Sequence, residues 1–309
     1  MNQRHRAGGD AVEVSYVQPY DFTLSTAAIR SRQPGGGSSE EPLRIPTLLH
    51  GFPTIVEVTA SGCGGALQAT SRPEADAEEV RALVEWVLFA ALDLSPFYKL
   101  ITQEPKLSPL ATGLHGLKPM RPVTLFEMAV IAITEQQVSL ASAYHVRERL
   151  VRTYGRQVDD LWVFPTPEVL GAATLEELRS LGLTRQKAGY IKTLAERIAS
   201  GELDMDRLES MDDATAKETI VGWRGFGAWS ADYMLVRGLA RPDAVPYGDI
   251  AIRSVVGKYF DDGSRVASDE VDKLLEPFRP WRGLLVFYLL SHERRMQRAR
   301  NKSYVSYPL

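Results

Sequence analysis

The sequence contains one cysteine, Cys63, among 309 residues. A single thiol excludes an internal disulfide, a thiolate zinc site and a four-cysteine iron–sulfur cluster. Cys63 lies within residues 61–65, a Gly-rich segment between two strand-like runs that is typical of a hairpin turn. We therefore interpret Cys63 as a turn residue rather than a nucleophile.

Long hydrophobic runs are also missing. Glu85 and Asp93 interrupt the longest apolar stretch, which is shorter than the ~18 residues that a membrane-spanning helix needs. Residues 1–10 are polar and carry no apolar region, so no secretory signal is predicted. The sequence therefore predicts a cytoplasmic protein with no membrane partner.

Charge of one sign is not in large excess, because the formal net charge is −3. Net charge does not decide whether a protein binds nucleic acid, since binding depends on how basic residues are clustered. One cluster lies near the end of the chain, where six basic residues accompany the single acid Glu293 between positions 281 and 309. A tail that touches DNA nonspecifically and a solvated terminal helix both fit this cluster.

Composition and hydrophobic spacing divide the chain into two parts. Residues 1–118 predict an α+β domain, with strands at 54–59 and 66–70. A helix is predicted over 80–92, where apolar residues recur every three or four positions. Residues 119–309 predict an all-α domain of short helices, in which no segment alternates like a strand.

Local signals mark a loop and several helix ends. Residues 33–42 are rich in Gly and Pro and predict a flexible loop. Thr124 and Thr174 each stand three residues before a glutamate, which is the pattern of a capping box. Thr184 is predicted to cap a helix that ends near Gly201.

A Gly-x-Gly turn, formed by Gly225, Phe226 and Gly227, lies between two helical runs of the second part. Glycines permit unusual backbone angles and leave no Cβ in the way, so amides at the start of the following helix can face an anion such as phosphate. A tight turn between helices that binds no ligand has the same composition. The turn alone does not distinguish these two interpretations.

Asp249 stands at the start of the helical run 250–260, directly after residues 246–248. At that position its carboxylate is an N-cap that accepts backbone N–H groups. The same N–H groups stabilise the carboxylate as an anion, and an oxocarbenium-like transition state needs negative charge beside it. Asp249 therefore fits both a structural cap and a catalytic group.

Together these motifs resemble the helix-hairpin-helix DNA glycosylase superfamily, and within it the 3-methyladenine DNA glycosylase II type. The resemblance covers most of the chain and implies an α+β N-terminal domain followed by an all-α helix-hairpin-helix glycosylase domain. It rests on residues 132–139 (AITEQQVS), 225–227 (GFG), 230–233 (SADY), 237–238 (RG), Pro246, Asp249 and 280–282 (PWR), in that order. Residues 19–22 (PYDF) match the accessory domain of bacterial members more loosely.

The resemblance implies roles for three polar residues. Gln137 takes the position of the wedge that fills the gap left by a flipped base, and Gln136 is the glutamine before it. Asp249 takes the position of the catalytic aspartate, which stabilises positive charge on the sugar while the N-glycosidic bond breaks. For the two glutamines, a polar pair that ends a buried helix is the alternative.

The resemblance also implies that the hairpin binds the DNA backbone. The amides of Gly225 and Gly227 would hold a phosphodiester on either side of Phe226. Arg224 stands where the family usually has proline, which adds a possible phosphate contact. A monovalent cation, if present as in the family, would be coordinated by the carbonyl oxygens of Val221, Trp223 and Phe226.

Trp229 stands two residues after the hairpin, where members with lyase activity carry their Schiff-base lysine. Tryptophan has no amine, so the resemblance implies a monofunctional glycosylase. Trp229 and Tyr233 would stack on a cationic alkylated purine through cation–π attraction. Packing of the two rings on one helix face is the alternative.

The sequence thus predicts a monomeric enzyme that removes alkylated purines of the 3-methyladenine type from damaged double-stranded DNA and leaves an abasic site. Two alternatives remain open. The same fold could act on deaminated or oxidised bases, or the hairpin could belong to a noncatalytic DNA-binding module. A third, more remote class is a hydrolase of free nucleosides, which would need no hairpin.

Overall fold

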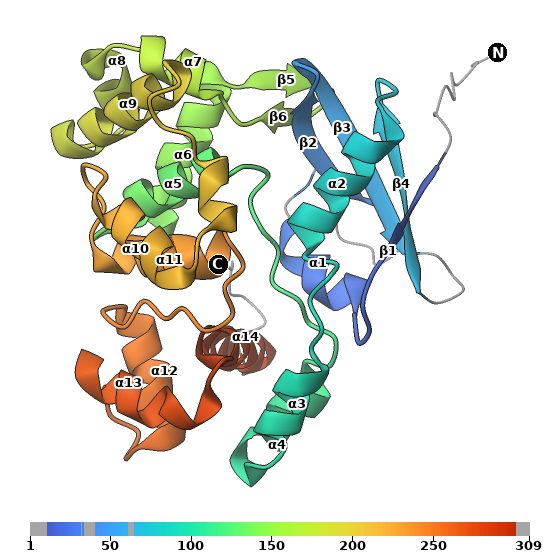
Figure 1. Ribbon diagram of the computed structural model, residues 1–309, viewed down its shortest axis with the longest axis vertical. Helices are drawn as coiled ribbons and strands as arrows, with labels where there is room; N and C mark the ends of the chain where they lie inside the picture. The colour runs from blue at the N-terminus through green and yellow to red at the C-terminus, as the bar shows by residue number, and fades with distance from the viewer. Residues whose placement is uncertain (1–10, 32, 34–40, 61–64, 301–309) are drawn as a thin grey trace. The chain divides into compact units, whose positions relative to one another are not determined.

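The computed structural model describes residues 11–31, 33, 41–60 and 65–300 (Figure 1). The chain forms two compact units, each assembled from separate stretches of sequence. The first comprises residues up to 93 with 116–123 and 151–165, and the second comprises 94–115, 124–150 and residues from 166 onwards. The turn around Cys63 and most of the loop predicted at 33–42 lie outside the described residues.

The first unit is built on a four-stranded antiparallel sheet with the strand order β1-β4-β3-β2. Its strands are β1 (Val12–Ser15), β2 (Leu43–Leu49), β3 (Phe52–Ala60) and β4 (Ala66–Arg72). Strands β3 and β4 confirm the two predicted strands, whereas β1 and β2 are additions. Pro46 obscures the strand pattern of β2, but β2 lies at the edge of the sheet, where a proline is tolerated.

Two helices complete the main body of this unit, α1 (Phe22–Arg30) and α2 (Ala77–Leu88). Helix α2 packs against β1 and β4 and confirms the predicted helix. It ends at Leu88 because Phe89 adopts a left-handed conformation with φ of 49°. The core joins one face of the sheet to one face of α2, through Val14, Leu43, Val56, Leu67, Val80, Val84 and Leu88.

Lys118 is a buried cation in the first unit. Its Nζ donates hydrogen bonds to the carbonyl oxygens of Val17, at 2.9 Å, and Ala90, at 2.8 Å. Loss of hydration lowers the pKa of Lys118 to about 8, against the opposing attraction of Asp93. Between that pH and the ordinary lysine pKa, the unfolded chain binds a proton that the folded chain does not. Stability therefore rises with pH across this window.

The Lys118→Met variant is expected to lack this rise. The free energy of unfolding of the wild type, minus that of the variant, should increase by about 1 kcal/mol from about pH 7.5 to about pH 9.5, after allowance for solvent screening. Urea unfolding at the two pH values measures the difference. Replacement of the exposed Lys99 by methionine is the control, and a wild-type advantage independent of pH would contradict the prediction.

A second, two-stranded sheet follows later in the chain, formed by β5 (Arg156–Val158) and β6 (Leu161–Val163). The expectation of no strand beyond residue 119 is wrong at this hairpin. Three-residue strands are too short to show alternation, and the turn uses Asp159 at φ of 50° instead of a glycine. The hairpin contacts β2 and β3, and Asp160 pairs with Arg44, so it belongs to the first unit.

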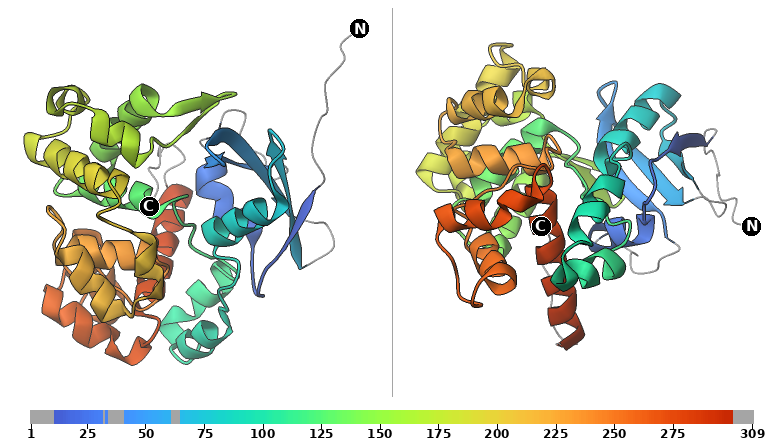
Figure 2. Two further views of the ribbon diagram at one scale, coloured as in Figure 1. Left: turned by 45° about the horizontal axis from the view of Figure 1, so that its top comes forward. Right: turned by 60° about the horizontal axis from the view of Figure 1, so that its bottom comes forward.

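The second unit is helical, which confirms the predicted fold class (Figure 2). Its longer helices are α5 (Leu125–Glu135), α6 (Leu140–Tyr154), α9 (Arg185–Ala199), α10 (Asp213–Val221), α11 (Ala228–Arg237), α12 (Ile250–Phe260), α13 (Ser268–Leu275) and α14 (Arg282–Arg300). Shorter ones are α3 (Ser95–Ile101), α4 (Ser108–Gly113), α7 (Pro167–Ala172) and α8 (Leu175–Ser180). Single 3-10 turns lie at Pro105–Leu107, Asp206–Ser210 and Glu276–Phe278.

The predicted helix starts are present. Thr124 accepts the N–H of Glu127 at the start of α5, and Thr174 forms a complete capping box with Glu177 in α8. Thr184 caps α9, which ends two residues before Gly201. None of the helices in the described part of the chain combines the length and apolar composition that a membrane crossing requires.

Helix α5 occupies the interior of the second unit. It is buried along most of its length and contacts both α9 and α11. Helix α5 therefore packs against α11, which carries Trp229 and Tyr233.

Candidate active site

The hairpin predicted around Gly225 joins α10 to α11. Gly225 has φ of +93°, a backbone conformation that favours glycine. A Cβ on Gly225 would lie 2.3 Å from Cγ of Tyr190, a residue of α9. The backbone of the turn therefore rests on an aromatic ring, and packing within the protein requires a glycine here.

Gly227 is a glycine for which the protein gives no such reason. It is the N-cap of α11, is exposed, and has φ of −114°, which any residue adopts. A Cβ at this position would meet nothing within 4 Å. The start of α11 can therefore be approached closely at Gly227, and the first amides of a helix favour an anion.

The carboxyl end of α5 is fastened to this hairpin. Gln136 Nε2 donates to the carbonyl oxygen of Gly225 at 2.8 Å and to Ser230 Oγ at 3.0 Å. Lys187 Nζ donates to the carbonyl oxygens of Thr134 and Gln136, at 2.9 and 2.6 Å. Burial lowers the pKa of Lys187. Gln136 thus lies at the hairpin as predicted, with its amide engaged by the turn.

Gln137, the next residue, is exposed and has φ of 54°. A left-handed glutamine costs of order 1 kcal/mol and persists where the surrounding structure fixes it. The contacts of Lys187 and Gln136 fix the residue immediately before it. The structure therefore holds Gln137 outward, next to Val138, whose side chain is also exposed.

The predicted catalytic carboxylate lies beside the aromatic pair. Asp249 Oδ1 accepts the N–H groups of Ala251, at 2.8 Å, and Ile252, at 3.2 Å, so Asp249 is the N-cap of α12. Its other oxygen, Oδ2, is 3.4 Å from Nε1 of Trp229. Trp229 in turn stacks on Tyr233, with ring centroids 5.0 Å apart and an interplanar angle of 29°.

Comparison with known proteins identifies the family. Residues 130–280 match the model of the HhH-GPD superfamily of base excision DNA repair proteins. This range includes the end of α5, the hairpin and Asp249. The chain belongs to the HhH-GPD superfamily.

Individual relatives agree with this assignment. A DNA-3-methyladenine glycosylase of Bacillus subtilis is 30% identical over 201 residues, which are 64% of this chain and 66% of that protein. The chain therefore spans about two thirds of that relative's length.

Solved structures share the fold. A 3-methyladenine DNA-glycosylase from Archaeoglobus fulgidus has a TM-score of 0.79 at 22% identity, covering 93% of this chain and 99% of that one. An 8-oxoguanine glycosylase/lyase of Clostridium acetobutylicum, in complex with double-stranded DNA containing cytosine opposite 8-oxoG, has a TM-score of 0.72 at 17% identity. The latter match covers 94% of this chain and 99% of that one. At these identities the likeness concerns the fold alone.

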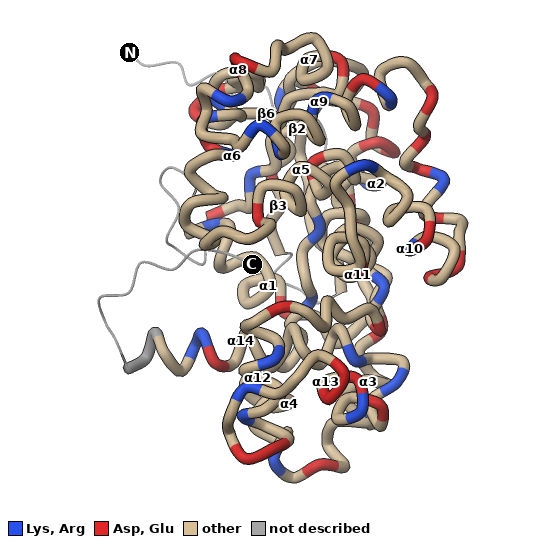
Figure 3. Tube along the Cα trace, turned by 90° about the vertical axis from the view of Figure 1, so that its left-hand side faces the viewer, with Lys and Arg blue, Asp and Glu red and all other residues tan. Residues whose placement is uncertain are grey.

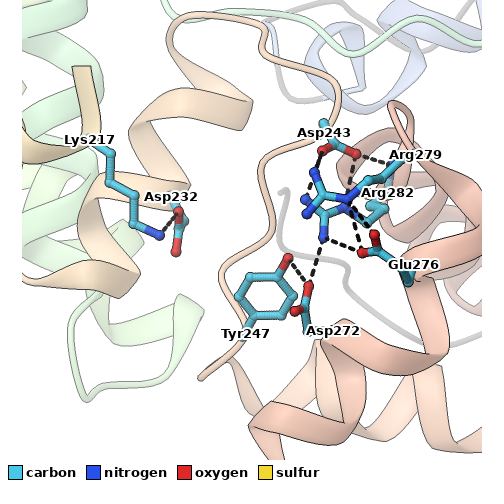
Figure 4. A network of polar contacts seen from close by, with 8 residues as sticks. All are labelled: Lys217, Asp232, Asp243, Tyr247, Asp272, Glu276, Arg279 and Arg282. Atoms are coloured by element: carbon cyan, nitrogen blue, oxygen red, sulfur yellow. Dashed lines mark hydrogen bonds and ion pairs between the residues drawn. The ribbon is translucent and has the colours of Figure 1, made fainter. Parts of the chain in front are cut away.

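A dense polar network holds residues 243–247, the segment that leads to Asp249 (Figure 4). The buried Arg282, from the PWR motif, forms two hydrogen bonds with Asp243 at 2.9 and 2.7 Å and a third with Asp272 at 2.7 Å. Asp272 also accepts the hydroxyl of Tyr247, two residues before Asp249. The sequence motif indicated Arg282 without its partners, since these come from α13 and from a loop.

A separate ion pair links the two helices of the hairpin. Lys217 of α10 lies 2.7 Å from Asp232 of α11, whose side chain is buried (Figure 4). Burial raises the pKa of Asp232, and the neighbouring Lys217 opposes this shift. The pair bridges α10 and α11 next to the turn that they enclose.

The ligands that the sequence implies for a monovalent cation are backbone carbonyl groups of the turn, those of Val221, Trp223 and Phe226. The Trp223 carbonyl accepts the N–H of Phe226 at 3.0 Å, which uses one of its two lone pairs. Phe226 and Trp223 are buried and stack edge to face, so the backbone between them is well fixed. Val221 is the last residue of α10, and it is exposed. Hard cations prefer such oxygen ligands.

Charged residues of both signs are interspersed along the helices of the second unit (Figure 3). Arg224 is exposed on the hairpin, where it can meet a phosphate. Helix α14 extends through Arg294 to Arg300, so the first part of the basic cluster is helical. Lys302 lies outside the described residues.

The Trp229→Phe variant tests the contact between the indole and Asp249. Phenylalanine keeps a ring for the stack with Tyr233 but removes the N–H donor, so base release should slow by about 3- to 10-fold. Single-turnover kinetics measure this, with Trp162→Phe in β6 as the matched control. An unchanged rate would show that the indole N–H does not help to position the carboxylate.

Proposed function

We propose that this protein is a monofunctional DNA glycosylase that hydrolyses the N-glycosidic bond of alkylated purines in double-stranded DNA and leaves an abasic site. The observation that carries the proposal is the position of Asp249, which is held by helix amides and by the indole of Trp229. The relationship to DNA-3-methyladenine glycosylases supports the substrate class. Residues 119–309 would form the catalytic domain and residues 1–118 the accessory domain.

DNA binding is assigned to the hairpin and to the end of α5. The amides at Gly225 and Gly227 hold a phosphodiester, with Arg224 as an additional contact. Gln137 enters the duplex in place of the flipped base, and Gln136 holds the two elements together. A cation on the turn carbonyls would add positive charge next to the phosphate.

Catalysis is assigned to Asp249. As the bond between C1′ and the base nitrogen breaks, both bonding electrons leave with the base, and the sugar becomes oxocarbenium-like. The carboxylate stabilises this positive charge, and water then adds to C1′ and loses a proton. A cationic methylated purine leaves as a neutral molecule, so strong acid catalysis is not required.

Absence of a lysine at Trp229 supports a monofunctional reaction, because no amine stands at that position to attack C1′. The stacked Trp229 and Tyr233 present electron-rich rings that attract a cationic base, with an energy of ~0.5 to 2 kcal/mol.

A panel of duplexes tests the proposal. Each duplex carries one 7-methylguanine, hypoxanthine or 8-oxoguanine, and base release and strand cleavage are followed with and without alkali. We expect release of the methylated purine, with cleavage only after alkali. Cleavage without alkali would indicate a lyase, preferential release of 8-oxoguanine or hypoxanthine would favour the alternative substrates, and binding without release would indicate a noncatalytic module.

A further inference from the structure

Glu135 is a buried carboxylate that the proposed reaction does not yet use. It is the last residue of α5, and its side chain is only 6% exposed. Carbonyl groups at the end of a helix carry partial negative charge, so a carboxylate at this position is unfavourable. Burial adds a further cost unless the charge is well partnered. An unfavourable residue inside a site calls for a functional reason.

The partners of Glu135 are specific. Oε1 pairs with Nη1 of Arg147, at 2.9 Å, and that guanidinium also donates to Thr134 Oγ1. Oε2 accepts the hydroxyl of Tyr233 at 2.9 Å. The carboxylate therefore lies between a cation from α6 and a phenol from α11, with one oxygen bonded to each.

The contact with Glu135 changes the phenol in two ways. It fixes the ring of Tyr233 in the stack with Trp229, whose indole lies next to Asp249. It also polarises the O–H bond, because hydrogen bonds to a charged acceptor are stronger than neutral ones and shift electron density toward the donor. Burial and the charge of Glu135 raise the pKa of Tyr233, so the phenol stays protonated and keeps donating.

We propose that Glu135 is a specificity-determining residue that acts through Tyr233: the carboxylate makes the aromatic pair more electron-rich and thereby favours cationic over neutral bases. The inference rests on the proposed function, because it assumes that a damaged base meets this pair. It assigns selectivity to a residue that has no contact with the base. Arg147 and Arg237 oppose the effect of the carboxylate on the same phenol.

The experiment compares cationic 7-methylguanine with neutral hypoxanthine in otherwise identical duplexes. Single-turnover rates of base release are measured for the wild type, Glu135→Gln, Tyr233→Phe and the double variant. Glutamine keeps the shape and an oxygen acceptor but removes the charge. The ratio of the two rates is the readout, because a general loss of folded protein or of DNA affinity cancels in it.

The ratio of 7-methylguanine to hypoxanthine rates is expected to fall about 5-fold in Glu135→Gln, within the range of cation–π effects. In the Tyr233→Phe background the same substitution should leave the ratio unchanged, since the phenol through which it acts is gone. The control Glu202→Gln removes an exposed carboxylate that pairs with Arg197, and it should keep the wild-type ratio.

Two results would overturn the inference while leaving the proposed function intact. Glu135→Gln could lower both rates equally, or it could change the ratio equally in the presence and absence of the Tyr233 hydroxyl. A wild-type protein that releases neither methylated nor deaminated base would instead overturn the proposed function, and the role of Glu135 with it. The wild-type rates thus separate the two failures.

Discussion

The Asp249→Asn variant should release methylated purines about 10²- to 10³-fold more slowly than the wild type, while it binds the same duplex with similar affinity. The substitution removes the negative charge of the side chain and keeps the helix cap. Asparagine retains the oxygen that accepts the N–H groups of Ala251 and Ile252, so the start of α12 is preserved. What is lost is the negative charge to which we assign stabilisation of the sugar in the transition state.

A matched control exists in the first unit. Asp76 caps α2 with the same geometry, since its Oδ1 accepts N–H groups two and three residues ahead at 2.9 and 3.2 Å. Asp76→Asn should therefore lose as little stability as Asp249→Asn. Unlike Asp249→Asn, it should release base at the wild-type rate. Thermal unfolding and single-turnover kinetics of both variants make the comparison. Equal activity of Asp249→Asn and the wild type would show that Asp249 is a cap and nothing more.

Sequence patterns predicted those parts of the site that depend on local chemistry. A Gly-x-Gly turn, an aspartate before a helix and two aromatic residues four positions apart can each be read from neighbouring residues. The structure brings Trp229 and Asp249 into contact and links Gln136 to the hairpin. That convergence depends on the packing of α5, α11 and α12, which no local pattern contains.

The residues that the sequence did not indicate are those with distant partners. Glu135 belongs to the AITEQQVS motif of residues 132–139, yet its bonds with Arg147 and Tyr233 join three helices. Tyr190 gives no sign in the sequence that it supports Gly225. The same limit applies to the fold, where the short β5–β6 hairpin contacts β2 and β3, which lie far away in the sequence.

The second large effect is expected at the hairpin. Substitution of one of its glycines should affect folding, and substitution of the other should affect DNA binding. Gly225→Ala combines a left-handed φ with a Cβ placed against the ring of Tyr190. The strained backbone and the overpacking together should lower the free energy of unfolding by about 2 to 4 kcal/mol. Gly227→Ala meets no atom within 4 Å and no backbone strain, so its stability should stay within about 1 kcal/mol of the wild type.

At Gly227 the expected effect is on DNA binding and not on stability. A methyl group at Gly227 would fill space that is open in the structure, and we expect it to keep a phosphate from the first amides of α11. We expect affinity for a lesion-containing duplex to fall at least about tenfold in Gly227→Ala, with unfolding by urea almost unchanged. Wild-type affinity in this variant would mean that the hairpin amides do not hold the DNA.

The contact with Tyr190 can be tested separately from backbone strain. If the ring is the obstacle to Gly225→Ala, then a Tyr190→Ala substitution in the same protein should recover the overpacking part of the loss but not the part due to positive φ. The two substitutions should therefore destabilise less together than the sum of their separate effects. Strict additivity would place the whole cost in the backbone and remove the ring as the reason for glycine. A stable Gly225→Ala would contradict both causes, because each follows directly from the conformation of the turn.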